Sequence, residues 1–129
     1  MDIQTTTRTE LIDITDRVRA AVKESSIKDG ICVISTRHTT SGIIVNENEH
    51  GLRADILDML ESLVPGDRNY AHNSIDNNAD AHLRAVLLGM SETIPIEDRH
   101  LVLGTWQSIF FVELDGPRNR TINVKVIKA

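Results

Sequence analysis

Three of the five histidines lie in or beside predicted strands, turns and helices that could fix the orientation of the imidazole ring. His38 lies in the hydroxyl-rich segment RHTTSG, His72 in a long polar stretch, and His82 just after that stretch. Three neutral imidazoles around one open position are typical of catalytic zinc. If these segments converge, the sequence predicts a divalent metal site, with zinc as the expected ion. The alternative is isolated histidines, because no pair has the H-x-x-x-H spacing. We expect His50, in the first turn of a predicted helix, and His100, at the start of a predicted strand, to be solvated surface residues.

A carboxylate follows the next apolar run and allows two interpretations. Glu47 and Glu49 flank Asn48 at the point where a predicted strand gives way to a helix. In the first interpretation, both acids complement the positive helix N-terminus and Asn48 caps it. In the second, Glu47 is a general acid or base beside the imidazoles. Its place at the end of the strand makes it the preferred candidate.

Two arginines near the C-terminus suit an anionic ligand. Arg118 and Arg120 alternate along an extended segment, so their guanidinium groups are expected on the same face. Paired guanidinium groups suit a phosphate or diphosphate. Thr39 and Ser41, in the hydroxyl-rich segment, could add donors to the same anion. The alternative is a solvated hairpin tip, because Asp115-Gly116 is a strong turn signal.

The motif Gly104-Thr105-Trp106-Gln107 interrupts an apolar run. A glycine within a strand often marks a bulge or a close approach of another backbone. Trp106 either fills the core or walls a pocket, and both roles are compatible. In the second case the Gln107 amide would recognise a polar group of the ligand.

The elements that must position these residues follow from the apolar pattern. Helical spacing and capping residues predict three helices, over 13–30, 48–63 and 80–89. Apolar runs and alternation predict strands within 2–9, 31–36, 41–47, 91–98, 100–115 and 120–128. The polar segment 66–79 has no apolar period and exceeds the usual length of a connection. We expect one α+β domain over residues 1–129, with a largely antiparallel sheet of six or seven strands.

Composition excludes several classes of partner. The formal charge is -5, which argues against general binding to nucleic acid or to an anionic membrane surface. No apolar run approaches the ~20 residues of a membrane helix, and no signal-peptide pattern is present. We therefore expect a cytoplasmic protein whose partner is a small molecule.

Six motifs follow one another along the chain: HTTSG, NEN, Tyr70-Ala71-His72, Ala81-His82, GTWQ and the Arg-rich segment after Gly116. Taken in this order, they resemble the YjbQ family, also called secondary thiamine-phosphate synthase enzymes. The resemblance covers residues 5–127 and departs at Gly42, where many members carry alanine.

The resemblance implies a homotrimer of α+β subunits with a metal site. The family's histidines fall on His38, His72 and His82. The implied activity joins a pyrimidine methyl diphosphate to a thiazole phosphate and releases diphosphate. In that reaction Arg118 and Arg120 would stabilise the leaving group, and Trp106 and Gln107 would contact the pyrimidine.

Three hypotheses for function stay open on the residues alone. The first is a metal-assisted enzyme acting on a phosphorylated or diphosphorylated small molecule, by condensation or by phosphatase-like hydrolysis. The second is a metal- or ligand-binding module without turnover. The third is a structural protein whose polar loops are only turns. The combination of hydroxyl, carboxylate and imidazole groups favours the first.

Overall fold

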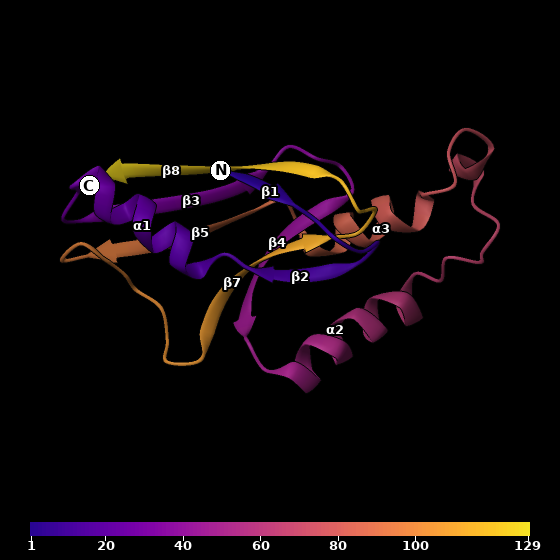
Figure 1. The fold of residues 1–129 in the computed structure, drawn as a ribbon, viewed down its shortest axis with the longest axis horizontal. Coiled ribbons are helices and arrows are strands. Elements are labelled where there is room, and N and C mark those ends of the chain that lie inside the picture. The colour runs from indigo at the N-terminus through magenta and orange to yellow at the C-terminus, as the bar shows by residue number, and fades with distance from the viewer.

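The chain forms three α-helices and eight β-strands, and the computed structural model describes residues 1–129 (Figure 1). The helices are α1 (Thr15–Ser25), α2 (His50–Leu63) and α3 (Ala79–Leu88), with a 3-10 turn, η1, at Ala71–Ser74. The strands are β1 (Asp2–Gln4), β2 (Glu10–Asp13), β3 (Gly30–Thr36), β4 (Ser41–Glu47), β5 (Ser91–Glu97), β6 (His100–Leu101), β7 (Gln107–Glu113) and β8 (Asn119–Lys128). None of the helices has the length and hydropathy needed to cross a membrane.

The strands form two sheets instead of the one expected. One has five strands in the order β1-β8-β3-β5-β6, and the other has three in the order β2-β7-β4. All the strand pairs are antiparallel. The predicted α+β class, its antiparallel character and its three helices are therefore confirmed. The strand count is eight, one more than the upper prediction.

Each sheet contributes to a layered core. The larger cluster lies between the five-stranded sheet, α1 and one face of the three-stranded sheet, and includes Cys32, Ile34, Ile43 and Phe111. The smaller cluster lies on the other face of β7, around Phe110, and is covered by α2 and α3. Consecutive strand residues point to opposite faces, so the neighbouring phenylalanines of β7 serve different clusters.

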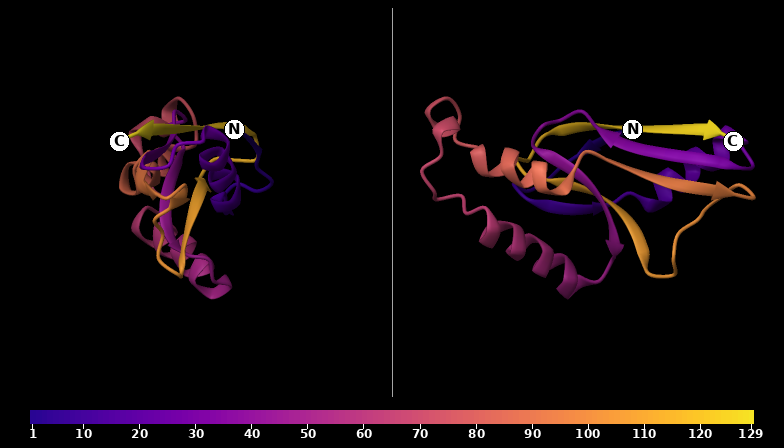
Figure 2. Two further views of the ribbon diagram at one scale, coloured as in Figure 1. Left: turned by 90° about the vertical axis from the view of Figure 1, so that its left-hand side faces the viewer. Right: turned by 180° about the vertical axis from the view of Figure 1, so that it is seen from behind.

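Helix α2 extends away from the sheets and is loosely attached. Leu60 is its one buried residue, and the loop that leads to α3 projects beyond the sheets (Figure 1 and the right-hand view of Figure 2). The predicted Asn48 cap is wrong, because the Glu49 carboxylate accepts the Leu52 N–H at 2.5 Å. Asn48 instead donates to Asp13 at 2.8 Å.

Two predicted connections differ from the structure. The expected strand 100–115 is divided into β6 and β7, which belong to different sheets, and residues 102–106 bridge them. The expected hairpin at Asp115-Gly116 is also wrong, because β7 and β8 belong to different sheets. Alternation shows that a segment is extended but does not identify the strand with which it pairs, so both crossings between sheets were missed.

Candidate functional site

The hydroxyl-rich segment is a tight turn that joins β3 of one sheet to β4 of the other. Thr36 Oγ1 and Ser41 Oγ lie 2.9 Å apart, and Ser41 Oγ donates to the His38 carbonyl at 3.0 Å. The His38 N–H closes the turn by donating to Thr36 Oγ1 at 3.2 Å. The predicted anion donor Ser41 is buried, and its hydroxyl is committed to this turn.

His38 is fixed over the start of β8. The Thr121 N–H donates to His38 Nε2 at 3.0 Å. This bond continues the β3–β8 ladder beyond its last pair, Thr36 and Ile122. Burial lowers the pKa of the imidazole, and the positive charges of Arg120, Arg37 and Arg118 lower it further, while Glu113 opposes them. His38 is therefore neutral at pH 7, and its proton lies on Nδ1.

His72 and His82 lie next to each other, because the loop that carries His72 folds back on α3. Their ring centroids are 4.8 Å apart and the rings meet edge to face at 73°. Asn78 Nδ2 donates to Asp115 at 2.9 Å, so Asn78 Oδ1 faces His72 Nε2, also at 2.9 Å. His72 must donate in this bond, which leaves the lone pair of its Nδ1 free.

His38 and His82 line the same polar pocket, with a volume of about 310 Å³. Three guanidinium groups face one carboxylate there, and no apolar side chain takes part. The lining consists of Arg37, His38, Thr39, Thr40, Asn78, His82, Asp115, Arg118 and Arg120. This pocket therefore has the charge and the donors expected of an anion site.

A second hollow adjoins the polar pocket. It has a volume of about 490 Å³ and shares Arg37, His38, Thr39 and His82 with the polar pocket. Its other lining residues include Ala85, Val86 and Met90, and its surface is mostly apolar. A ligand with a charged end and an apolar ring could occupy both hollows together.

Arg120 owes its position to a buried carboxylate. Its Nε donates to Glu113 Oε1 at 2.8 Å and its Nη2 to Thr40 Oγ1 at 2.9 Å, with a second Nη2 bond to Glu113. Both partners of the ion pair are almost fully buried. Nη1 makes no hydrogen bond within the protein, and Arg120 lines the polar pocket. The guanidinium is therefore rigid and has one donor group available to a ligand.

Glu113 remains ionised despite its burial. Burial alone would raise the pKa of this carboxyl, but hydrogen bonds from Arg120, Thr5 and the Asp115 amide outweigh it and lower the pKa. Thr5 Oγ1 donates to Glu113 Oε1 at 2.7 Å. By contrast Arg118 is half exposed and is held only by Asp115, at 3.2 Å.

Three predicted site residues, Glu47, Trp106 and Gln107, lie away from the polar pocket within the single chain. Glu47 is paired with Gln107 at one end of the β4–β7 ladder, and Ser41 with Glu113 at the other. That length of strand corresponds to about 20 Å. Trp106 lies beside Gln107 and is 71% exposed, and the Gln107 amide oxygen accepts the Gly104 N–H at 2.8 Å. None of the three lines the pocket that contains His38.

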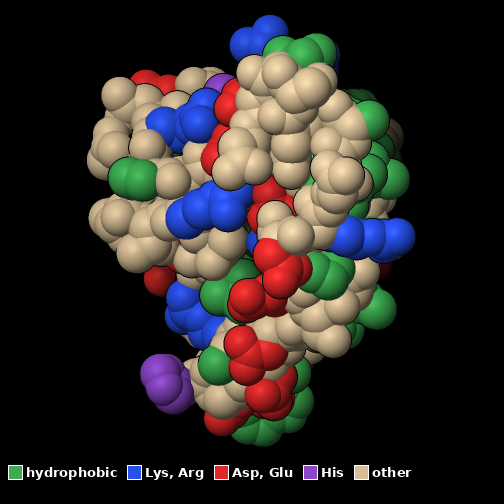
Figure 3. Space-filling model, turned by 90° about the vertical axis from the view of Figure 1, so that its right-hand side faces the viewer, with side chains coloured by type: hydrophobic (Ala, Val, Ile, Leu, Met, Phe, Trp, Pro, Cys, Tyr) green, Lys and Arg blue, Asp and Glu red, His purple; other side chains and the backbone are tan.

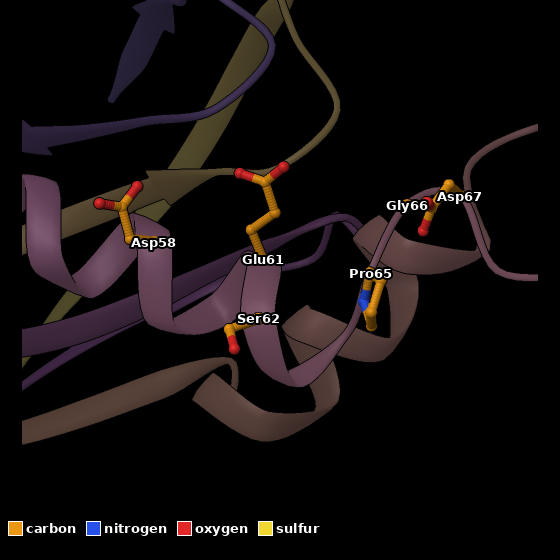
Figure 4. A pocket seen from close by; sticks show the side chains of 6 residues that line it. All are labelled: Asp58, Glu61, Ser62, Pro65, Gly66 and Asp67. Atoms are coloured by element: carbon orange, nitrogen blue, oxygen red, sulfur yellow. The ribbon is translucent and has the colours of Figure 1, made fainter.

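A larger pocket than the polar one is acidic and lies away from the histidines. Asp58 and Glu61 project from α2 toward the same side, and Gly66 and Asp67 lie beyond the end of the helix (Figure 4). The volume is about 570 Å³. Acidic side chains also gather beside Lys and Arg on the molecular face in Figure 3. The negative lining would repel a phosphorylated ligand, so charge favours the smaller pocket as the candidate site.

The imidazoles fit a metal ion only in part. No group of three or more His, Cys, Asp or Glu side chains has metal-binding geometry. His72 Nδ1 has a free lone pair, and His82 makes no hydrogen bond through its ring, so these two imidazoles are available as ligands. His38 is not available, because the Thr121 amide uses its only lone pair. The residues therefore do not fit the predicted three-imidazole site, and they leave two neighbouring imidazoles, His72 and His82, with unused lone pairs.

Several residues that shape the pocket were missed from sequence. Thr40 and Glu113 fix Arg120, and Asn78 and Asp115 fix His72. One signal was visible in SIFFVEL, where a charged residue interrupts an otherwise apolar strand. A charge at such a position is buried and needs a partner of opposite charge.

Comparison with known proteins places the chain in a family. The model of the family "UPF0047 protein YjbQ-like" matches residues 1–129. A UPF0047 protein of Methanothermobacter thermautotrophicus is 56% identical over 98% of this chain and 88% of its own length. The Bacillus subtilis protein YugU is 38% identical over 98% of this chain and 96% of its own length.

Solved structures agree with this assignment. A crystal structure from Sulfolobus solfataricus superposes with a TM-score of 0.98 at 45% identity, covering 100% of this chain and 94% of that chain. A crystal structure from Thermus thermophilus gives a TM-score of 0.86 at 32% identity, with coverages of 98% and 99%. The chain therefore belongs to the YjbQ/UPF0047 family.

Proposed function

We propose that this protein is an enzyme acting on a phosphorylated or diphosphorylated small molecule. The observation that carries the proposal is the Arg120 guanidinium, which lines the polar pocket, is held rigidly by Glu113 and Thr40, and makes no hydrogen bond through Nη1. A donor fixed before the ligand arrives stabilises developing charge without reorganisation. Arg37 and Arg118 add positive charge at the same place.

The pocket pair suits a reaction in which diphosphate leaves. The polar pocket would hold the phosphoryl groups, and the adjoining apolar hollow would hold an aromatic ring. In a thiamine-phosphate synthase-type condensation, a thiazole nitrogen forms a bond to the pyrimidine methylene carbon. The carbon–oxygen bond to diphosphate breaks, and its electron pair leaves with the diphosphate. Arginine contacts that strengthen as this charge develops would accelerate the reaction.

A divalent ion, with zinc as the expected metal, would be held by His72 and His82. When bound, it would neutralise charge on phosphoryl oxygens. Within the protein, the Asn78 amide fixes the His72 ring so that Nδ1 is available. The relay from Asp115 through Asn78 thus prepares one imidazole before any ligand arrives.

Calorimetric titration with pyrophosphate tests the proposal directly. We expect saturable binding that Arg118→Gln and Arg120→Met each weaken about tenfold or more, the loss expected for one charge-assisted bond. Arg19→Gln is the matched control, because Arg19 is an exposed arginine paired only with Asp16. Equal affinity in all three variants would refute the anion site.

Turnover needs a separate measurement. Diphosphate release from a pyrimidine methyl diphosphate should require the thiazole phosphate if the reaction is condensation. Release without the thiazole phosphate would indicate a hydrolase. Tight binding of substrate analogues with no turnover under any condition would indicate a binding module.

We further propose that the chain assembles as a homotrimer. Support comes from large apolar side chains left in solvent on α2, α3 and the segment after α3, namely Met59, Leu63, Leu83, Val86, Leu87 and Met90. Exposed apolar groups in such number mark interaction surfaces. Light scattering coupled to size-exclusion chromatography would give three times the 14.4 kDa chain mass. A monomer at micromolar concentration would contradict this proposal.

A further inference from the structure

We propose that His38 binds the phosphoryl group of the ligand as a hydrogen-bond donor through Nδ1–H, and that the Thr121 amide fixes this role. This inference rests on the proposed anion site. It assigns His38 a role different from the metal ligand predicted from sequence.

The tautomer follows from the partner of Nε2. A backbone N–H can only donate, so the 3.0 Å bond from Thr121 requires a lone pair on His38 Nε2. In a neutral imidazole the other nitrogen then carries the hydrogen. The opposite tautomer would place two N–H groups against each other and leave the Thr121 amide without its partner, which is unfavourable.

The surroundings of His38 keep the ring neutral and the Nδ1–H available. Arg37, Arg118 and Arg120 all line the pocket with it, and their charges disfavour a second proton on the imidazole. No protein group accepts a hydrogen bond from Nδ1. A donor without a partner, among guanidinium groups, has an anionic acceptor as its natural complement.

His72 is held in the opposite tautomer. Its Nε2 carries the hydrogen and donates to Asn78, and its Nδ1 carries the lone pair. The two imidazoles are thus prepared for different tasks. His38 presents a hydrogen to an anion, whereas His72 presents a lone pair to a metal ion or a proton. Coordination of a metal by His38 Nδ1 would require loss of the hydrogen on Nδ1, which is the only N–H of the neutral ring.

Arg120 completes the receptor around the same anion. Its free Nη1 and the His38 Nδ1–H both belong to groups whose other donors or acceptors are satisfied within the protein. Glu113 is a positioning residue, since it contacts Arg120 and not the pocket.

Nuclear magnetic resonance of the full-length, ¹⁵N-labelled protein tests the tautomer without reference to activity. Long-range ¹H–¹⁵N correlation at pH 7.5 distinguishes a protonated Nδ1 from a protonated Nε2. We expect His38 to show protonated Nδ1 and His72 to show protonated Nε2. Addition of Cd²⁺ as a probe should produce metal–nitrogen coupling at His72 and His82 only. A protonated Nε2 at His38, or coupling between cadmium and His38, would overturn the inference.

Matched variants test the contact with the anion. Asparagine places an amide N–H near the position of Nδ1, whereas leucine places no donor there. We expect His38→Asn to bind pyrophosphate within about threefold of the wild type and His38→Leu to bind about tenfold more weakly. Both variants should retain the zinc content of the wild type, whereas His82→Ala should lose it.

These outcomes separate the inference from the proposed function. If the wild type binds no pyrophosphate, the anion site itself fails. If the wild type binds it and His38→Leu binds equally well, the role of His38 alone fails. Thermal unfolding of each variant shows whether it is folded, and the wild-type tautomer stands or falls independently of any variant.

Discussion

Ser41 and Glu113 face each other at the end of the β4–β7 ladder, so the His38 turn and the support of Arg120 are built on one strand pair. Ser41 closes the turn through the His38 carbonyl, and Glu113 holds the guanidinium of Arg120. The register of these strands is fixed by buried Ile43 and Phe111 two residues away in the same ladder. Core packing therefore sets the geometry of the polar pocket before a ligand arrives.

Replacement of Glu113 by glutamine should destabilise the protein strongly. The change leaves the Arg120 guanidinium buried without its counter-charge, and breaking a buried pair in this way costs about 3–5 kcal/mol. Urea unfolding followed by circular dichroism measures the loss. Glu10→Gln is the control, because Glu10 is bonded only to nearby Thr6 in an exposed segment.

The double variant Glu113→Leu with Arg120→Met gives a sharper test of the same pair. It removes both charges, so it should be less destabilised than the sum of the two single variants. Additive losses would show that the two residues do not interact.

The lowered pKa of Glu113 makes stability depend on pH in one direction. Its folded pKa lies below its ordinary value of 4.5, so the unfolded chain takes up the proton more readily. The contribution to stability is complete above pH 4.5 and is lost as pH falls through the folded pKa. Urea midpoints measured from pH 7 down to pH 3 should fall, and they should fall less in Glu113→Gln. Parallel curves for the two proteins would contradict the assignment.

Asn78 is predicted to tune metal binding without touching the metal. Asn78→Leu removes the acceptor for His72 Nε2–H and the donor to Asp115. Loss of such an orienting partner typically lowers metal affinity about 10–100-fold. Competition with a zinc-sensitive dye measures the change, with exposed Asn77→Leu as the control. Equal zinc affinity in both variants would remove the proposed role of Asn78.

Sequence patterns predicted the local parts of the site better than its assembly. The turn around His38 follows from a buried strand that ends in a run of hydroxyls, and its local hydrogen bonds need no distant partner. The closeness of His72 and His82 followed from a loop that folds back on its helix. Both predictions involve residues near each other along the chain.

The misplacements involve long-range pairing. Trp106 and Gln107 were expected beside the imidazoles, but the register of β7 on β4 puts them with Glu47 at the far end of the ladder. Arg118 and Arg120 both line the polar pocket, but the sequence did not indicate that Arg120 is buried against Glu113, where β8 brings it by crossing to the other sheet. The alternation of apolar and polar residues along a strand predicts neither the register in which the strand pairs nor the sheet to which it belongs.

Gly42, in β4, lies in close contact with the C-terminal end of α3. A Cβ at this position would lie 2.9 Å from Leu88 Cβ and 3.1 Å from the Gly89 carbonyl oxygen, at the end of α3. The Ile43 N–H donates to the same carbonyl at 3.3 Å, so the backbone there cannot move away freely. Gly42→Ala should therefore cost about 1–3 kcal/mol through overpacking.

The matched control is Gly51→Ala in α2. There the nearest atoms to an added Cβ are the exposed carboxylate oxygens of Glu49, at 3.2 Å, which can shift slightly while still capping α2. Alanine favours a helix over glycine by up to about 1 kcal/mol. In thermal and urea unfolding, we expect Gly42→Ala to be less stable than the wild type and Gly51→Ala to be at least as stable as the wild type. Because α3 carries His82 on the turn before Leu88, we also expect Gly42→Ala to weaken pyrophosphate binding, whereas Gly51→Ala should not. A Gly42→Ala protein as stable as the wild type would contradict the prediction and would show that α3 can move away from β4 at little cost.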